Sequence, residues 1–207
     1  MTGMTGAMTG MTGAAAREVR ARFDDETITV YQAYPARIAE PALEAGTFVD
    51  PFKRARMTWI KPSFLWMMYR CGWATKTDQE RVLAIDITRD GFEGALSQSC
   101  LSHFDRTRFP TAEEWRAAVR SSPVRVQWDP ERDLNLNPLP HRAIQIGLSG
   151  PAVEQYVENW ISGIRDVTPL AREVHAAVVD GSLDAAASLL PEERVYPLPA
   201  ALAERIA

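Results

Sequence analysis

The sequence predicts an α+β protein with a central, mostly antiparallel sheet, flanking helices and a C-terminal helical layer. Two observations lead to this class. Segments rich in β-branched and aromatic residues alternate with amphipathic segments in the first part of the chain, and the chain from about residue 150 is mainly helical. Such an order is typical of α+β proteins. The 207 residues are enough for one sizeable domain, which we expect over residues 17–207.

Residues 1–16 are expected to be a disordered leader outside this domain. They consist of Met-Thr-Gly units and alanines, without charge and without an apolar period. They also lack the basic region with which a signal peptide begins.

The first half of the chain alternates strands with helices. We expect strands at residues 27–34, 57–60 and 81–88, and helices at 35–46, 62–72, 91–102 and 111–120. The strand segments are rich in Val, Ile, Thr, Tyr and Trp. Pro35 and Pro62 take first-turn positions of their helices, and Gly46 and Gly72 end them. Thr111 begins a Thr-Ala-Glu-Glu capping box.

The second half carries two strands and then helices. We expect strands at 124–128 and 142–148 with a loop at 133–140, helices at 152–164, 169–179 and 183–190, and an extended tail at 195–199. Asp129 and Pro130 end the first of these strands, because Pro lacks the N–H that a sheet requires. The leucines of the loop are expected to contact the body of the domain.

Composition and spacing exclude several classes of function. A net charge of −4 argues against a protein that coats nucleic acid non-specifically. The three histidines and two cysteines show no ligand spacing, so we expect no metal. No nucleophile elbow and no Gly-rich phosphate loop occur in the sequence. Without a secretory h-region or an apolar run of membrane-spanning length, we expect a cytoplasmic protein with no membrane partner.

A polar pair interrupts the aromatic-rich segment at residues 56–66. Lys61 and Ser63 lie where a strand leads into a helix, and the free amides of a helix N-terminus attract anions. Because burying an ammonium group is costly without an anion, we expect a phosphate or pyrophosphate here. The alternative is a surface lysine beside an ordinary helix cap. Basic residues cluster in the same part of the sequence: Lys53, Arg54, Arg56, Lys61 and Arg70.

Two strands present further candidates. On residues 27–34, Gln32 and Tyr34 share one face and Tyr31 takes the other, and an amide between aromatics can bind an amide or a base edge. The alternative is a strand with one face in solvent. On the strand from residue 124, Gln127 and Asp129 share a face.

Glu131 follows Pro130, just past the expected end of that strand, and Arg142 begins the next one. A carboxylate at a strand end suits a general base or a ribose-binding group, and arginine suits a phosphate clamp. Glu131 with Arg132 and Arg142 would equally suit a structural ion pair.

Five stretches of the sequence resemble a family described as domain of unknown function 4291. They are residues 30–34 (VYQAY), 56–70 (RMTWIKPSFLWMMYR), 79–85 (QERVLAI), 127–132 (QWDPER) and 142–148 (RAIQIGL). The resemblance extends from about Arg17 to about Trp160. It implies no particular activity, because the family description names none.

The opening of the chain is also similar to that of ADP-ribosyltransferase folds. These begin with a strand bearing Arg or His, followed by a helix and a Gly turn, and their NAD site includes a Ser or Tyr near a strand-to-helix junction and a late-strand Glu. The resemblance implies that Gln32, Ser63 and Glu131 take these catalytic positions, with Gln in place of Arg or His.

Cleavage of NAD requires an acid at the nicotinamide ribose, a cation at the pyrophosphate and an aromatic wall. The acid would be Glu131 or Asp129. The residues that we assign to NAD binding are Tyr31, Tyr34, Trp59, Lys61, Gln127, Asp129 and Arg142. We therefore expect an ADP-ribosyltransferase-like enzyme whose acceptor is a nucleic acid or a small molecule. The same residues would suit a non-catalytic nucleotide- or RNA-binding module, and the C-terminal helices would suit an interaction domain.

Overall fold

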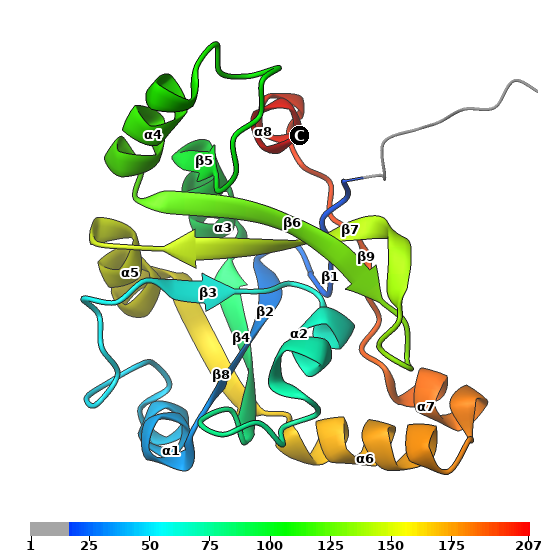
Figure 1. Ribbon diagram of the computed structural model, residues 1–207. Helices are drawn as coiled ribbons and strands as arrows, with labels where there is room; N and C mark the ends of the chain where they lie inside the picture. Colours follow the sequence, from blue (N-terminus) through cyan, green and yellow to red (C-terminus); the bar gives the residue numbers. More distant parts are fainter. Residues whose placement is uncertain (1–16) are drawn as a thin grey trace, which may run out of the picture.

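The computed structural model describes residues 17–207, so the expected leader lies outside the described residues (Figure 1). The α+β class with mostly antiparallel sheets is confirmed. The strands divide between two main sheets, however, where the sequence predicted one central sheet. Figure 1 shows that β3, β6 and β7 run across the direction of β4 and β8, with helices around them.

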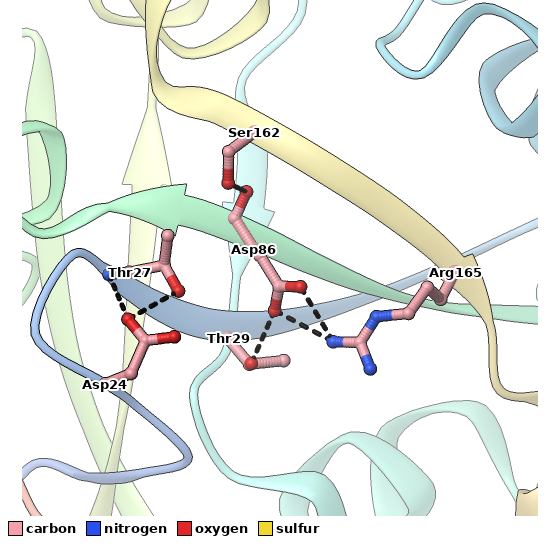
Figure 2. Close-up of polar contacts among 6 residues, drawn as sticks. All are labelled: Asp24, Thr27, Thr29, Asp86, Ser162 and Arg165. Carbon is pink, nitrogen blue, oxygen red and sulfur yellow. Dashed lines mark hydrogen bonds and ion pairs between the residues drawn. The ribbon is translucent and has the colours of Figure 1, made fainter.

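The first sheet has three antiparallel strands. In spatial order they are β2 (Thr27–Tyr34), β4 (Arg81–Thr88) and β8 (Ile161–Asp166). Asp86 on β4 accepts hydrogen bonds from Thr29 Oγ1 at 2.6 Å and from Arg165 Nη2 at 2.9 Å, which ties the three strands together (Figure 2). In the same view, Asp24 accepts a hydrogen bond from the backbone N–H of Thr27 at 2.7 Å and so closes the turn that enters β2.

The second sheet has four strands. In spatial order they are β3 (Thr58–Ile60), β7 (Pro138–Leu148), β6 (Val124–Arg132) and β5 (Ser99–Leu101). Their pairings are antiparallel except for β5 with β6. A short pair joins β1 (Arg20–Ala21), near the start of the described chain, to β9 (Arg194–Val195), which precedes α8.

The two main sheets meet at Lys61, the residue after β3. The backbone N–H of Tyr31 on β2 donates to the carbonyl oxygen of Lys61 at 2.7 Å. This bridge fixes the side chains that follow β3 against those of β2, and we call the junction the seam.

Helices surround the sheets. They are α1 (Ala36–Ala45), α2 (Phe64–Cys71), α3 (Arg89–Ser97), α4 (Ala112–Ser121), α5 (Pro151–Gln155), the π-helix η1 (Tyr156–Trp160), α6 (Thr168–Val179), α7 (Leu183–Leu189) and α8 (Ala200–Ile206). The predicted stops are confirmed, because Gly46 and Gly72 adopt left-handed φ angles of 70° and 59° at the ends of α1 and α2. Ser63 and Thr111 cap the N-termini of α2 and α4.

Alternation along β2 divides the buried residues into two clusters. Ile28 and Val30 belong to the main core, which fills the space between the two sheets together with side chains of α3 and η1. Tyr31 points to the other face, into a second cluster covered by α2, α6 and α7. The predicted C-terminal layer therefore consists of α6 and α7, whereas Figure 1 places α8 at the opposite end of the molecule, beside α3 and β5.

The helix predicted at 152–164 is wrong in its last part. The chain is helical to Trp160 and then extends as β8, where Ile164 pairs with Ile85 of β4. Ile161 and Ile164 have helical spacing, so the local pattern favoured a helix. Pairing with β4 is a tertiary interaction that overrides this preference.

Other boundaries also differ from the sequence prediction. The helix expected to reach 102 ends at Ser97, because residues 99–101 pair with β6. Strand β6 continues through Pro130 to Arg132, with an irregular register between these two residues. Glu131 therefore lies within a strand and not past its end, and the loop shrinks to residues 133–137. The tail at 195–199 leads into α8, which is too short to show a clear period.

Candidate functional site

A cavity of about 370 Å³ opens at the seam. Strand β2 contributes Gln32 and Tyr34, β3 contributes Thr58 and Trp59, and the residues of α1, α2 and two loops complete it. Five basic side chains line this seam cavity: Arg37, Lys53, Arg56, Lys61 and Arg70. Among the described residues that line it, Asp78 is the only acid, and Arg37 Nη2 binds it at 2.9 Å.

The remaining cations of the seam cavity are not neutralised by the part of the chain that the structure describes. Lys53, Arg56, Lys61 and Arg70 form no ion pair within residues 17–207. Arg54, which belongs to the same cluster in sequence, instead binds Glu154 at 2.6 Å and Glu158 at 2.7 Å. Four of the five basic residues that cluster in the sequence therefore line the seam cavity, and Arg37 of α1 lines it as well.

Lys61 is the buried member of this group, with 6% of its surface exposed. Its Nζ atom donates to the carbonyl oxygen of Trp59 at 3.1 Å and lies 5.6 Å from the centre of the Trp66 ring. Burial and, to a lesser extent, the charge of Arg70 lower the pKa of Lys61 to about 7, although the charge of Asp129 partly offsets them. The alternative of an exposed surface lysine is wrong.

Gln32 lies in a buried hydrogen-bond network at the base of the seam cavity. Its Nε2 atom donates to Thr58 Oγ1 at 2.6 Å and to Tyr34 Oη at 2.9 Å, and its Oε1 atom accepts from Tyr156 Oη at 2.8 Å. The predicted shared face of Gln32 and Tyr34 is confirmed. Both ends of the amide are hydrogen-bonded, so that Gln32 links β2, β3 and η1. Gln32 is also buried, and the alternative of a strand face in solvent is therefore wrong.

Ser63 and Glu131 meet at a different cavity, of about 240 Å³, which we call the Glu131 cavity. Glu131 is 6% exposed, and its Oε1 atom accepts from Ser63 Oγ at 2.9 Å and from the backbone N–H of Arg132 at 2.8 Å. Glu131 forms no ion pair with Arg132 or Arg142 in the described chain. The structure thus brings together two of the three residues that the sequence placed in catalytic positions.

The N-terminus of α2 is already occupied by protein groups. Glu193 Oε1 accepts from the backbone N–H of Phe64 at 2.7 Å, and Ser63 Oγ accepts from that of Trp66 at 3.1 Å. The expectation that these amides hold a phosphate is therefore wrong for this conformation, because the carboxyl group of Glu193 fills the position.

Two acids of the Glu131 cavity have raised pKa values. Burial raises the pKa of Glu131, and burial together with the charge of Glu131 raises the pKa of Glu193 to about 8. A carboxyl group with a higher pKa in the folded protein keeps its proton longer when folded. The free energy of unfolding therefore falls as the pH rises from 4.5 towards about 8.

Replacing Glu193 by glutamine is expected to remove the contribution of Glu193 to the pH dependence of stability. The variant keeps a side-chain oxygen that can accept from the backbone N–H of Phe64. The variant should be more stable than the wild type at about pH 8.5 and similar to it at about pH 4.5, measured by urea denaturation. Glu192→Gln, at the exposed neighbouring residue, is the matched control and should follow the wild type. A constant difference between Glu193→Gln and wild type across this range would contradict the raised pKa.

The remaining predicted residues do not join either cavity. Gln127 and Asp129 share a face as predicted, since Gln127 Nε2 donates to Asp129 Oδ1 at 3.0 Å, and Gln145 Nε2 donates to the other oxygen at 2.7 Å. Tyr31 is buried in the second hydrophobic cluster. Arg142 lies opposite Pro130 on β7 and lines neither cavity.

Some site residues had no clear signal in the sequence. Glu193, Arg20 and His141 line the Glu131 cavity, but they come from three segments that are far apart in the chain. Asp78 and Arg37 of the seam cavity are likewise joined only by the fold. The mixture of aromatic and basic residues at 53–70 was the signal that located most of the seam cavity.

Trp59 forms a wall of the seam cavity because Gly147 gives its ring room. The two residues pair across β3 and β7, and a Cβ atom on Gly147 would lie 2.9 Å from Trp59 Cζ2 and from Met57 Sδ. Gly147→Ala is therefore expected to lower the free energy of unfolding by about 1–3 kcal/mol in urea denaturation. Gly94→Ala is the control, because a Cβ atom there meets nothing within 4 Å. Equal stability of the two variants would contradict this role of Gly147.

The described residues contain no group of three or more His, Cys, Asp or Glu side chains placed to hold a metal ion. Within residues 17–207, no helix has both the length and the apolar character needed to span a membrane. The expected cytoplasmic location, the absence of a metal and the oligomeric state stay untested.

Comparison with known proteins gives one family. A family model described as "Domain of unknown function (DUF4291)" matches residues 18–196, which confirms the first resemblance stated from the sequence. A search of curated proteins finds no match to this chain. Neither result supports the resemblance to ADP-ribosyltransferase folds, which stays a prediction.

Proposed function

Because the chain belongs to this family, whose description names no activity, we propose from the geometry of the chain itself that the seam cavity binds a phosphate-bearing ligand of the nucleotide class. One observation carries the proposal: Lys53, Arg56, Lys61 and Arg70 line one cavity and have no ion-pair partner within residues 17–207. A concave site with several cations of this kind favours an anion with more than one charge.

The other walls of the cavity support a nucleotide over a simple anion. Trp59 and Tyr34 supply aromatic surface, on which a planar base or nicotinamide ring packs well. The volume of about 370 Å³ falls within the range of roughly 300–1,000 Å³ that is usual for small-molecule sites. NAD carries a diphosphate between its two nucleoside parts, and ADP carries a diphosphate at the end of one.

Calorimetric titration tests this proposal directly. ADP and NAD are expected to bind, and adenosine, which lacks phosphate, is expected to bind at least about tenfold more weakly, since one charged hydrogen bond contributes about 1.5–3 kcal/mol. The affinity for ADP should also fall as the salt concentration rises. If adenosine binds as tightly as ADP, or if neither ADP nor NAD binds, the proposal fails.

The enzymatic form of the proposal is NAD-dependent ADP-ribosyl transfer to a nucleic acid or a small molecule. The contact between Ser63 Oγ and Glu131 Oε1 favours it, because a serine and a late-strand glutamate are the pair that the resemblance implies. Glu131 is buried, and a carboxylate there would stabilise the positive charge that develops on the ribose as nicotinamide leaves. The ligand would have to extend from the seam cavity to the Glu131 cavity, past Pro62.

A transfer assay distinguishes an enzyme from a binding module. The protein is incubated with NAD labelled in its ADP-ribose part, together with RNA, single-stranded DNA or small acceptors. An enzyme should transfer the label or release nicotinamide, and Glu131→Gln should lose this activity while still binding NAD. A wild-type protein that binds NAD but neither cleaves it nor transfers the label is a binding module.

A further inference from the structure

We propose that Lys61 Nζ forms an imine with the carbonyl group of a phosphate-bearing aldehyde or ketone bound in the seam cavity. The inference rests on the proposed function, because the phosphate would be held by the other three cations of the cavity, Lys53, Arg56 and Arg70. It adds a covalent step and a substrate class that binding alone does not imply.

The surroundings of Lys61 favour a neutral amine over an ammonium ion. An ammonium group has three hydrogens to donate, and among residues 17–207 Nζ has one hydrogen-bond partner, the carbonyl oxygen of Trp59. Asp129, the acid whose charge acts on it, is held instead by Gln127 and Gln145. Arg70 on α2 adds a repelling positive charge. A buried cation with one acceptor and no counter-ion is strongly disfavoured.

The lowered pKa agrees with this geometry. With a pKa of about 7, half of Lys61 is free base at neutral pH, whereas an ordinary lysine with a pKa of 10.5 is almost entirely charged. The free base is then on the order of a thousandfold more abundant at Lys61 than at an exposed lysine. Lysines activated by burial and by a neighbouring cation are the ones that enzymes use as nucleophiles towards carbonyl groups.

The reaction balances without an oxidant, a reductant or a metal. The lone pair of the neutral Nζ forms a bond to the carbonyl carbon. The carbonyl oxygen leaves as water and takes both hydrogens of the amine, so that a C=N bond replaces the C=O bond.

The neighbouring cations define the substrate class. Lys53, Arg56 and Arg70 line the same cavity as Lys61 and stand on the loop before β3 and on α2, on either side of it in sequence. A phosphate bound by these groups would hold the carbonyl of a small molecule inside a cavity that Lys61 also lines, and such positioning accelerates an otherwise bimolecular reaction.

Trapping with borohydride tests the inference. The full-length protein is incubated with pyridoxal 5′-phosphate, an aldehyde that carries phosphate, and sodium borohydride then reduces any imine to a stable secondary amine that peptide mass spectrometry locates. We expect Lys61 to be labelled at least about tenfold faster than Lys53 or Lys76 at pH 7. Pyridoxal without phosphate should label it more slowly, and ADP should compete.

Matched variants complete the test. Lys61→Met should lose the fast label, and Lys76→Met, at an exposed lysine that does not line the seam cavity, should keep it on Lys61. The labelling rate should rise with pH with a midpoint near 7. If ADP binds but the label appears on Lys53 or Lys76 and not on Lys61, or reaches Lys61 equally fast without phosphate, this inference is overturned and the proposed function stands. If ADP does not bind at all, the proposed function itself fails.

Discussion

Replacing Trp128 by alanine is expected to lower the free energy of unfolding by about 3–5 kcal/mol, as is usual for the loss of a large buried aromatic side chain. Trp128 is 7% exposed and belongs to the main core between the two sheets. Its Nε1–H group also donates to the carbonyl oxygen of Ile206 at 2.6 Å. The substitution therefore leaves a cavity in the core and removes a hydrogen bond that holds α8 against β6.

Two further variants separate these contributions. Trp128→Phe keeps most of the apolar volume and should cost less, mainly through the lost hydrogen bond, which is worth about 1 kcal/mol. Trp115→Ala is the control, because Trp115 lies on α4, is partly exposed, and donates to the carbonyl oxygen of Leu101 in a similar way. Urea denaturation of the three variants measures the differences. An equal loss for Trp115→Ala and Trp128→Ala would contradict the placement of Trp128 in the core.

The double substitution Arg56→Ala and Arg70→Ala is expected to lower the affinity for ADP by about 100-fold or more. Each charged hydrogen bond to phosphate contributes roughly 1.5–3 kcal/mol, and about 1.4 kcal/mol corresponds to a factor of ten. Both arginines are exposed, so the free energy of unfolding should change little. Calorimetric titration with ADP measures the effect, and urea denaturation checks the fold.

Arg37→Ala is the matched control for this prediction. Arg37 lines the same cavity, but Asp78 already neutralises its charge. Its loss should lower the affinity for ADP by no more than a few-fold, because exposed ion pairs contribute about 0–1 kcal/mol. If the control weakens binding as much as the double variant does, the free cations are not what holds the phosphate.

The sequence predicted those parts of the fold that local patterns determine. Strands β2 and β4 have the predicted bounds, and α2 ends at the predicted Gly72, although it begins at Phe64 after the Ser63 cap and not at Pro62. The division into two sheets was not predictable, because it depends on which strands pair. Strand β8 shows the same limit. The spacing of Ile161 and Ile164 favours a helix, and only their pairing with β4 makes this segment a strand.

The candidate site was predicted in its parts but not in its grouping. The aromatic and basic segment around Lys61 pointed to a pocket, and the Ser63–Glu131 contact joins two residues that were singled out in the sequence. Lys61 and Ser63 are two residues apart but line different cavities. Only the fold could show this, because Ser63 caps α2 and lies beside Glu193, which comes from the C-terminal part of the chain and accepts from the backbone N–H of Phe64.

A crystal structure of the protein soaked with ADP tests the central claim most directly, because it locates the phosphates themselves. We expect the diphosphate in the seam cavity, within hydrogen-bond distance of the Arg70 guanidinium group, with the base or ribose against Trp59. A diphosphate bound beside Arg20 and His141 in the Glu131 cavity, or at no site on the protein, would contradict the account.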